Sequence, residues 1–142
     1  MRIKIKSTFS FSKLAKYVKS QEFNKFSNNS IVNPMVKDSK AYIKANKVTP
    51  ATHPNTLKER RKRKSPKSIG GNTTLYDTGV LHDSIKKAEG MGIEFVKYGL
   101  KHITGDRVPE RNFLVLDPKN SLKISNDIVK KFKKIFTTRL AK

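Results

Sequence analysis

The sequence predicts a small α+β fold, in which an antiparallel β-sheet is packed by N- and C-terminal helices and a long basic loop lies between them. Alternating apolar and polar residues at the N-terminus predict a strand, and helical spacing of apolar residues near both ends predicts helices. Residues 48–74 are punctuated by proline and glycine and contain few apolar side chains, which predicts a loop. The length of 142 residues fits a single domain, 1–142, with a modest core.

The N-terminal third combines a predicted strand with two predicted helices. Ile3, Ile5, Phe9 and Phe11 share one parity, as in a half-buried strand. Ser12 is expected to cap a helix, which the polar run 28–30 interrupts. The apolar residues of this helix are Leu14, Tyr17, Val18, Phe23 and Phe26. A second helix is predicted over about residues 34–47.

The loop 48–74 contains a run of cations, with a short helical turn expected after Thr56. The cations are Lys58, Arg60, Arg61, Lys62, Arg63, Lys64 and Lys67. Contact with nucleic-acid phosphates would make binding by these side chains steeply dependent on salt. A solvated loop without a partner accounts for the same composition, so both interpretations stay open.

The second half is expected to begin with a short helix, capped by a side-chain oxygen of Asp77 or Thr78. A β-hairpin with a Gly-rich turn is predicted over residues 88–99, and a loop over residues 100–109. The residues 112–116 are expected to form a short apolar element.

A last helix is predicted over about residues 120–140, with one apolar face and one face rich in Lys and Arg. Its apolar residues are Ile124, Ile128, Phe132, Ile135, Phe136 and Leu140. The apolar face is either core or subunit interface. The basic face either meets a polyanion or reflects the good helix-forming propensity of Lys.

Charge is the most extreme property of the composition, with 32 Lys and Arg against 11 Asp and Glu and a formal net charge of +21. Such a chain is attracted to polyanions, which include nucleic acid, anionic membranes and acidic protein surfaces. The chain has no Cys, which excludes disulfides, thiol catalysis and thiolate metal sites. No apolar run is long enough to span a bilayer, and the alternating N-terminus does not resemble a signal peptide, so production and action in a cytoplasm are expected.

The residue pattern does not favour catalysis. The histidines, His53, His82 and His102, are scattered without a second His or a carboxylate at metal-ligand spacing. His82, Asp83 and Ser84 are adjacent in sequence, but consecutive helical residues point in different directions, whereas a catalytic triad must converge in space. Phosphate-loop and dinucleotide motifs are absent from the sequence. The sequence therefore predicts a protein that is not an enzyme, without a cofactor or a catalytic metal.

The most informative stretch is residues 75–85, which read LYDTGVLHDSI. It resembles the L-x-D-T-G-x-L-x-x-S-I block of the phage virion-morphogenesis family, which includes tail-completion and related minor tail and head–tail joining proteins. Residues 108–114 are similar to the family's I-P-A-R-P-F-L segment. The matching positions are Leu75, Asp77, Thr78, Gly79, Leu81, Ser84, Ile85, Pro109, Arg111 and Phe113.

The resemblance covers roughly residues 50–140, with residues 75–140 as the family-like core. Residues 54–60 resemble the segment that precedes the first block, and residues 93–99 lie where the family has a strand. The chain departs from the family pattern between the blocks and at Asn112, which stands in place of a second proline.

The residue types in the two blocks are suited to structural roles rather than to catalysis. Gly79 permits close backbone approach or an unusual dihedral angle. Pro109 fixes the entry to the next element, Arg111 offers a planar fork for a carboxylate, and Phe113 is expected to anchor in the core.

The resemblance implies a function in assembly. Such a protein completes or joins the tail at the neck, or head–tail interface, as a ring of copies in the virion, after synthesis in the host cytoplasm. Its expected partners are tail tube, tail terminator or connector proteins, with packaged DNA as a further contact and no membrane. Charge alone supports an alternative, a non-enzymatic basic nucleic-acid-binding protein, which leaves both blocks unexplained.

Overall fold

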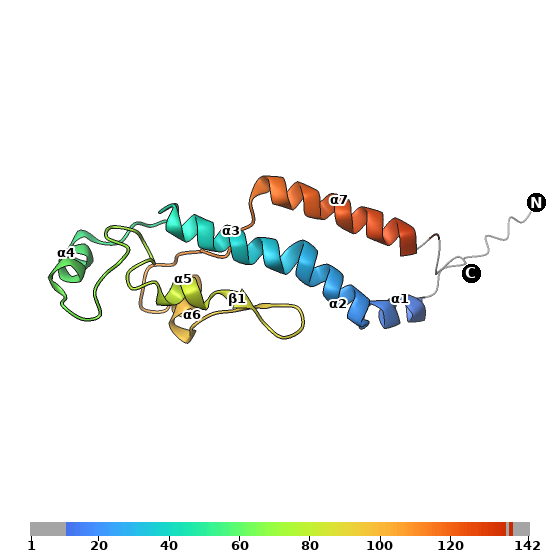
Figure 1. The fold of residues 1–142 in the computed structure, drawn as a ribbon, viewed down its shortest axis with the longest axis horizontal. Helices are drawn as coiled ribbons and strands as arrows, with labels where there is room; N and C mark the ends of the chain where they lie inside the picture. The colour runs from blue at the N-terminus through green and yellow to red at the C-terminus, as the bar shows by residue number, and fades with distance from the viewer. Residues whose placement is uncertain (1–10, 136, 138–142) are drawn as a thin grey trace, which may run out of the picture.

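The computed structural model describes residues 11–135 and residue 137. Helices dominate this part of the chain, which also contains one pair of short strands (Figure 1). Residues 3–9 of the predicted N-terminal strand, and residues 136 and 138–140 of the last predicted helix, lie outside the described residues. The prediction is wrong at Phe11 and Ser12, because a helix begins at Phe11 and Ser12 lies within it rather than at its cap. In chain order, the elements are α1 (Phe11–Val18), α2 (Gln21–Ser27), η1 (Asn28–Val32), α3 (Asn33–Lys44), α4 (Pro54–Lys62), α5 (Val80–Ser84), β1 (Lys86–Lys87), β2 (Ile93–Glu94), α6 (Lys97–Thr104) and α7 (Pro118–Ile135).

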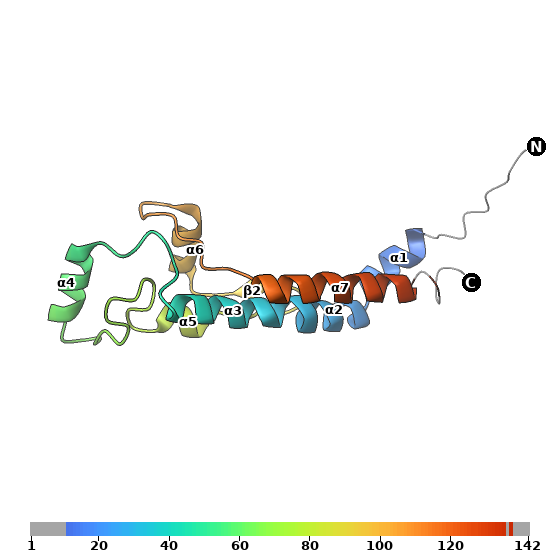
Figure 2. The same ribbon diagram turned by 90° about the horizontal axis from the view of Figure 1, so that it is seen from above.

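Helix α3 is the central helix, which contacts η1, α5 and β1. Together with α2 and η1 it forms a continuous rod, along which α7 runs on one side (Figures 1 and 2). Helix α5 and strand β1 contact the opposite side of α3, and α6 lies beyond α5 (Figure 1). The described chain is therefore a small, mostly helical α+β fold with a two-stranded antiparallel sheet. The sheet packs on α3, whereas α7 lies on the far side of the rod.

The predicted interruption at residues 28–30 is wrong, because the helix continues through it. Residues 28–32 form the π-helical turn η1, in which the N–H of Asn33 donates to the carbonyl of Asn28. The physical reason is Pro34, which stands at the start of α3. Proline has no N–H, and in a regular α-helix its ring clashes with the carbonyl four residues earlier, so a wider turn before it relieves the clash.

The main core lies where α3, α5 and the stretch before α7 meet. It consists of Ile43, Val48, Leu75, Leu81, Ile85 and Phe113. Phe113 is fully buried, and its ring meets the ring of Phe95 edge-on at a centroid distance of 5.4 Å. The two segments that resemble the phage family, residues 75–85 and 108–114, are called the two family-like blocks. Several of their residues are therefore core residues. A smaller cluster of Tyr17 and Ile135, with Phe23 against it, joins α1 and α2 to α7.

The apolar element predicted at residues 112–116 is held to α3 by side-chain hydrogen bonds. The fully buried hydroxyl of Ser39 accepts the N–H of Val115 at 3.1 Å and donates to its carbonyl at 3.4 Å. One residue earlier on α3, the carboxylate of Asp38 accepts the N–H of Asp117 at 2.8 Å. Consecutive residues of α3 thus position the start of α7.

Replacing Ser39 with alanine is expected to lower the free energy of unfolding by about 1–2 kcal/mol, because the N–H of Val115 loses its acceptor. Urea unfolding followed by circular dichroism measures the change. Ser125→Ala is the matched control, since this exposed hydroxyl donates only to the carbonyl of Ser121 in its own helix, and its cost should stay below about 0.5 kcal/mol. Equal losses in the two variants would contradict a link between α3 and residue 115.

The start of α5 differs from the expectation. The residue before the helix is Gly79, whose φ of +83° lies in the left-handed region, and no side chain caps the helix. The predicted cap by Asp77 or Thr78 is therefore wrong. The carboxylate of Asp77 is turned instead toward arginine side chains.

The hairpin is confirmed, but its strands are short and begin earlier than predicted, with Lys86 opposite Glu94. The predicted strand end at residues 97–99 and the loop from residue 100 are wrong up to residue 104, because these residues form α6. Gly99 explains the difference: it is buried, and a Cβ at this position would come within 2.8 Å of a Leu81 methyl group. Helix α6 therefore packs on α5 at a distance that glycine alone allows.

Candidate functional site

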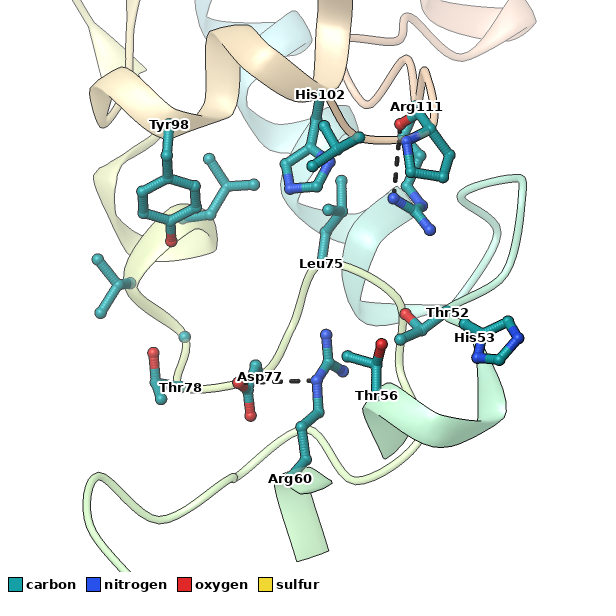
Figure 3. A pocket seen from close by; sticks show the side chains of 15 residues that line it. Thr52, His53, Thr56, Arg60, Leu75, Asp77, Thr78, Tyr98, His102 and Arg111 are labelled. Carbon is teal, nitrogen blue, oxygen red and sulfur yellow. Dashed lines mark hydrogen bonds and ion pairs between the residues drawn. The ribbon is translucent and has the colours of Figure 1, made fainter. Parts of the chain in front are cut away.

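The two family-like blocks, separated in sequence, meet at one cleft of about 430 Å³ (Figure 3). Its walls come from the start of α4, the stretch leading into α5, one face of α6 and the loop before Phe113. Of the positions that match the family pattern, Leu75, Asp77, Thr78, Gly79, Leu81, Pro109 and Arg111 line the cleft, as does Arg60 of the basic run. Ser84, Ile85 and Phe113 do not line it, and the latter two are fully buried in the core.

Arg111 is a buried cation in the wall of this cleft, with a residue exposure of 7%. Its Nε donates to the carbonyl of Pro50 at 2.8 Å, and its Nη2 lies 3.4 Å from the carbonyl of Ala51. A carboxylate partner was expected, but within the described residues Arg111 forms no ion pair. Burial, and then the nearby charge of Arg60, lower the pKa of Arg111 from its ordinary value. The carbonyls orient the guanidinium without neutralising its charge.

Asp77 is bound by two arginines of the basic run. Its Oδ2 lies 2.7 Å from Nη2 of Arg63 and 3.6 Å from Nε of Arg60. Arg60 also donates to the carbonyl of Thr73 at 3.0 Å. Burial raises the pKa of Asp77, but hydrogen bonds from Arg63 and Ser68 and the charges of both arginines outweigh it, so the pKa is lowered. This carboxylate fastens α4 to the loop that leads into α5.

The basic run is divided between two roles. It was expected in a loop, but residues 58–62 belong to α4, which begins at Pro54 and is capped by the ring nitrogen of His53. Arg60 and Arg63 turn inward to Asp77. The remaining cations are exposed, namely Lys58, Arg61, Lys62, Lys64 and Lys67. Helix α4 stands at one end of the molecule, apart from the rod (Figures 1 and 2).

Helix α6 contributes Tyr98 and His102 to the cleft, and the sequence interpretation missed both. Burial, and then the charge of Arg111, lower the pKa of His102, so the imidazole is neutral near pH 7. Its Nδ1 is buried without a hydrogen-bond partner among the described residues. Burial raises the pKa of Tyr98, which keeps the phenol neutral. The two residues are four apart and so share one face of α6. This spacing would have pointed to both residues only if a helix had been predicted here.

The adjacent residues His82, Asp83 and Ser84 do not form a catalytic triad. The hydroxyl of Ser84 donates to the carbonyl of Leu81 at 2.8 Å and accepts the N–H of Val96 at 3.1 Å. His82 Nδ1 lies 2.7 Å from Asp83 Oδ1, and the two partners of the Ser84 hydroxyl are both backbone groups. Ser84 therefore connects α5 to the hairpin.

No protein-family model, curated protein or solved structure matches this chain. Among residues 11–135 and 137, no group of His, Asp or Glu side chains is arranged to hold a metal ion. In the same part of the chain, no helix combines the length and the apolar character needed to cross a membrane. The geometry of the cleft and the distribution of charge therefore carry the functional argument.

Proposed function

We propose that this chain is a structural phage protein that completes or joins the tail at the neck of a virion as a ring of copies. The observation that carries the proposal is the convergence of the two family-like blocks on one cleft and one core. Residues that resemble a family motif by chance have no reason to meet in space. The partners are then tail tube, tail terminator or connector proteins, and the site of action is the virion.

Exposed apolar side chains support an assembly function. Leu122 and Val129 on α7 are 66% and 51% exposed, and Val80 beside the cleft is 50% exposed. These side chains lie on different elements of a chain that otherwise carries a high density of charge. Leu122 and Val129 lie seven residues apart and share one face of α7, and an exposed apolar stripe of this kind is a candidate for burial against another subunit.

The second candidate is binding to nucleic acid, which the exposed cations of α4 and the following residues favour. Lys58, Lys64 and Lys67 are exposed and form no ion pair among the described residues. Such side chains can contact phosphates without reading sequence. In a neck protein the same surface would face packaged DNA, so this candidate can also be one part of the first.

The deciding experiment is the native mass of nucleic-acid-free protein in about 0.5 M salt, where phosphate contacts are screened. The measurement is made for the protein alone and after addition of purified connector and tail proteins, with electron microscopy of the particles. A discrete ring, alone or on those partners, supports the assembly function. A chain that stays at its monomer mass of 16.2 kDa with every virion protein, but binds duplex DNA at low salt, overturns it.

A matched pair of variants separates the two candidates. Replacing Lys58, Lys64 and Lys67 with Gln removes phosphate contacts while leaving the Arg60 and Arg63 contacts with Asp77 intact. We expect weaker DNA binding and a shallower dependence on salt, because the salt slope counts neutralised phosphates. Ring formation should be unchanged, and loss of the ring in this variant would place the exposed cations in the subunit interface instead.

A further inference from the structure

The side chains that line the cleft carry more positive than negative charge. The guanidinium groups of Arg60 and Arg111 both point into it, from opposite walls (Figure 3). Asp77 is the carboxylate in the wall, and it is already shared between Arg60 and Arg63. Glu110, the neighbour of Arg111, is exposed and forms no ion pair with it among the described residues. Arg111 donates one N–H from each of its three nitrogens to the carbonyls of Pro50, Pro109 and Ala51, which leaves two of its five N–H donors for an incoming carboxylate.

The rim of the cleft is apolar. Val80 is 50% exposed and Tyr98 is 45% exposed, and both line the cleft. Ile69, 62% exposed, lies against Gly79 in the wall of the cleft, since a Cβ at Gly79 would stand 3.0 Å from its Cδ1. The occupant should therefore combine a carboxylate with an apolar side chain. The phosphates of a duplex fit poorly, because Arg111 is recessed and because a phosphodiester backbone has no apolar group to place on the rim.

The turn of the hairpin carries this combination. Glu89 and Met91 flank Gly90, which has a φ of +76°. Met91 is 50% exposed, and Glu89 is exposed without an ion pair among the described residues. The turn projects from β1 and β2 away from α4, α5 and α6, so it points away from the cleft of its own chain (Figure 1).

We propose that the cleft of one copy receives the hairpin turn of the next copy, with the Glu89 carboxylate directed at Arg111 and the Met91 side chain on the rim formed by Val80 and Tyr98. The turn and the cleft lie at different ends of the same layer, so the contact is heterologous, and such contacts close into rings when the rotation permits. This inference rests on the proposed ring and names the contact that builds it. A charged side chain that enters the cleft also sets the register between copies.

Cross-linking tests this contact directly, because the chain has no native Cys. The full-length variants Met91→Cys and Val80→Cys are mixed, assembled under the conditions that give rings, and treated with a short bismaleimide. The expected result is a covalent dimer in the mixture that exceeds the dimer yield of either variant alone. The control mixture is Met91→Cys with Ser125→Cys, whose exposed position on α7 lies outside the cleft. Both mixtures retain Glu89.

Charge reversal is the second test. Glu89→Lys is expected to convert the ring to the monomer mass, because the incoming charge would then repel Arg111. Glu59→Lys is the matched control: it makes the same change on exposed α4, where it loses only a surface contact with Lys62, and rings should persist.

The outcomes separate this inference from the proposed function. Rings that form without the Met91–Val80 cross-link, or that survive Glu89→Lys, overturn the hairpin contact and leave the ring in place. A chain that forms no ring with any virion protein overturns both. Protection of Val80→Cys from maleimide by short duplex DNA, but not by assembly, identifies the cleft as a polyanion site and also overturns the contact.

Discussion

Phe113→Ala is expected to lower the free energy of unfolding by about 3–5 kcal/mol, the largest loss we predict for a single side chain. Phe113 has no solvent exposure and packs its ring edge-on against Phe95. The residue also connects two parts of the fold, because the extended stretch it belongs to crosses from the cleft to α7. Truncation removes buried apolar surface and leaves a cavity that the surrounding side chains fill only in part. Domains of this size are stable by about 5–15 kcal/mol, so this single change removes much of the stability.

Equilibrium unfolding in urea, monitored by circular dichroism, measures this loss. Leu122→Ala is the control: its side chain is 66% exposed on α7, and its removal should cost less than about 1 kcal/mol. Phe113→Leu should fall between the two, because it keeps most of the apolar volume. A loss in Phe113→Ala no greater than that in Leu122→Ala would show that the core is not centred on this ring.

The sequence predicted the elements that have strong periodicity. The apolar spacing of α7 and the Gly-rich turn of the hairpin are local features, and both elements are present. Helix α6 was missed because residues 95–98 combine aromatic and β-branched side chains, which favour strand locally. The decisive contact is tertiary, the close approach of Gly99 to Leu81, which no local propensity contains.

The candidate site could be predicted only as separate residues. Asp77 and Arg111 were singled out from the sequence, but neither the two arginines that Asp77 meets nor the backbone carbonyls that Arg111 meets were predicted. A helix cap was expected for Asp77, because Asp in front of an apolar run is a common cap. Its actual partners, Arg60 and Arg63, belong to a run that looks uniformly solvated, since nothing local distinguishes an inward arginine from an exposed one. An ion pair between residues distant in sequence is a tertiary contact, so it cannot be predicted before the fold is known.

Asp77→Asn is the second large effect, with an expected loss of about 2–3 kcal/mol in the free energy of unfolding. The substitution keeps the size of the side chain but leaves two arginine side chains without their counter-charge. Arg60 is the more costly of them, because its side chain is only 12% exposed, compared with 34% for Arg63. The loss stays below that for a fully buried ion pair, because the Asp77 side chain is 25% exposed and partly screened by solvent.

The dependence on pH gives this prediction a second signature. The pKa of Asp77 is lowered in the folded protein, so the unfolded chain takes up a proton at higher pH than the folded one. Its contribution to stability is complete above the unfolded pKa of about 3.9 and is lost as the pH falls through the folded value. Other carboxylates titrate in the same range, so the measurement is the difference in unfolding free energy between wild type and Asp77→Asn. That difference should be constant from about pH 7 to 5 and should shrink below about pH 4.

The matched control for this effect is Asp83→Asn. Asp83 also lies in the stretch around α5 and also meets a basic group, His82, at 2.7 Å, but its side chain is 73% exposed. An exposed pair is worth less than about 1 kcal/mol, so this variant should retain nearly full stability at neutral pH. A double-mutant cycle with Arg63→Gln then isolates the coupling to Asp77, which should be at least about 1 kcal/mol. Additive losses in that cycle, or a pH-independent difference between wild type and Asp77→Asn, would mean that Asp77 does not fasten α4 to the loop before α5. The cleft would then lose one of its walls without loss of the core, because α4 carries no residue of the main cluster.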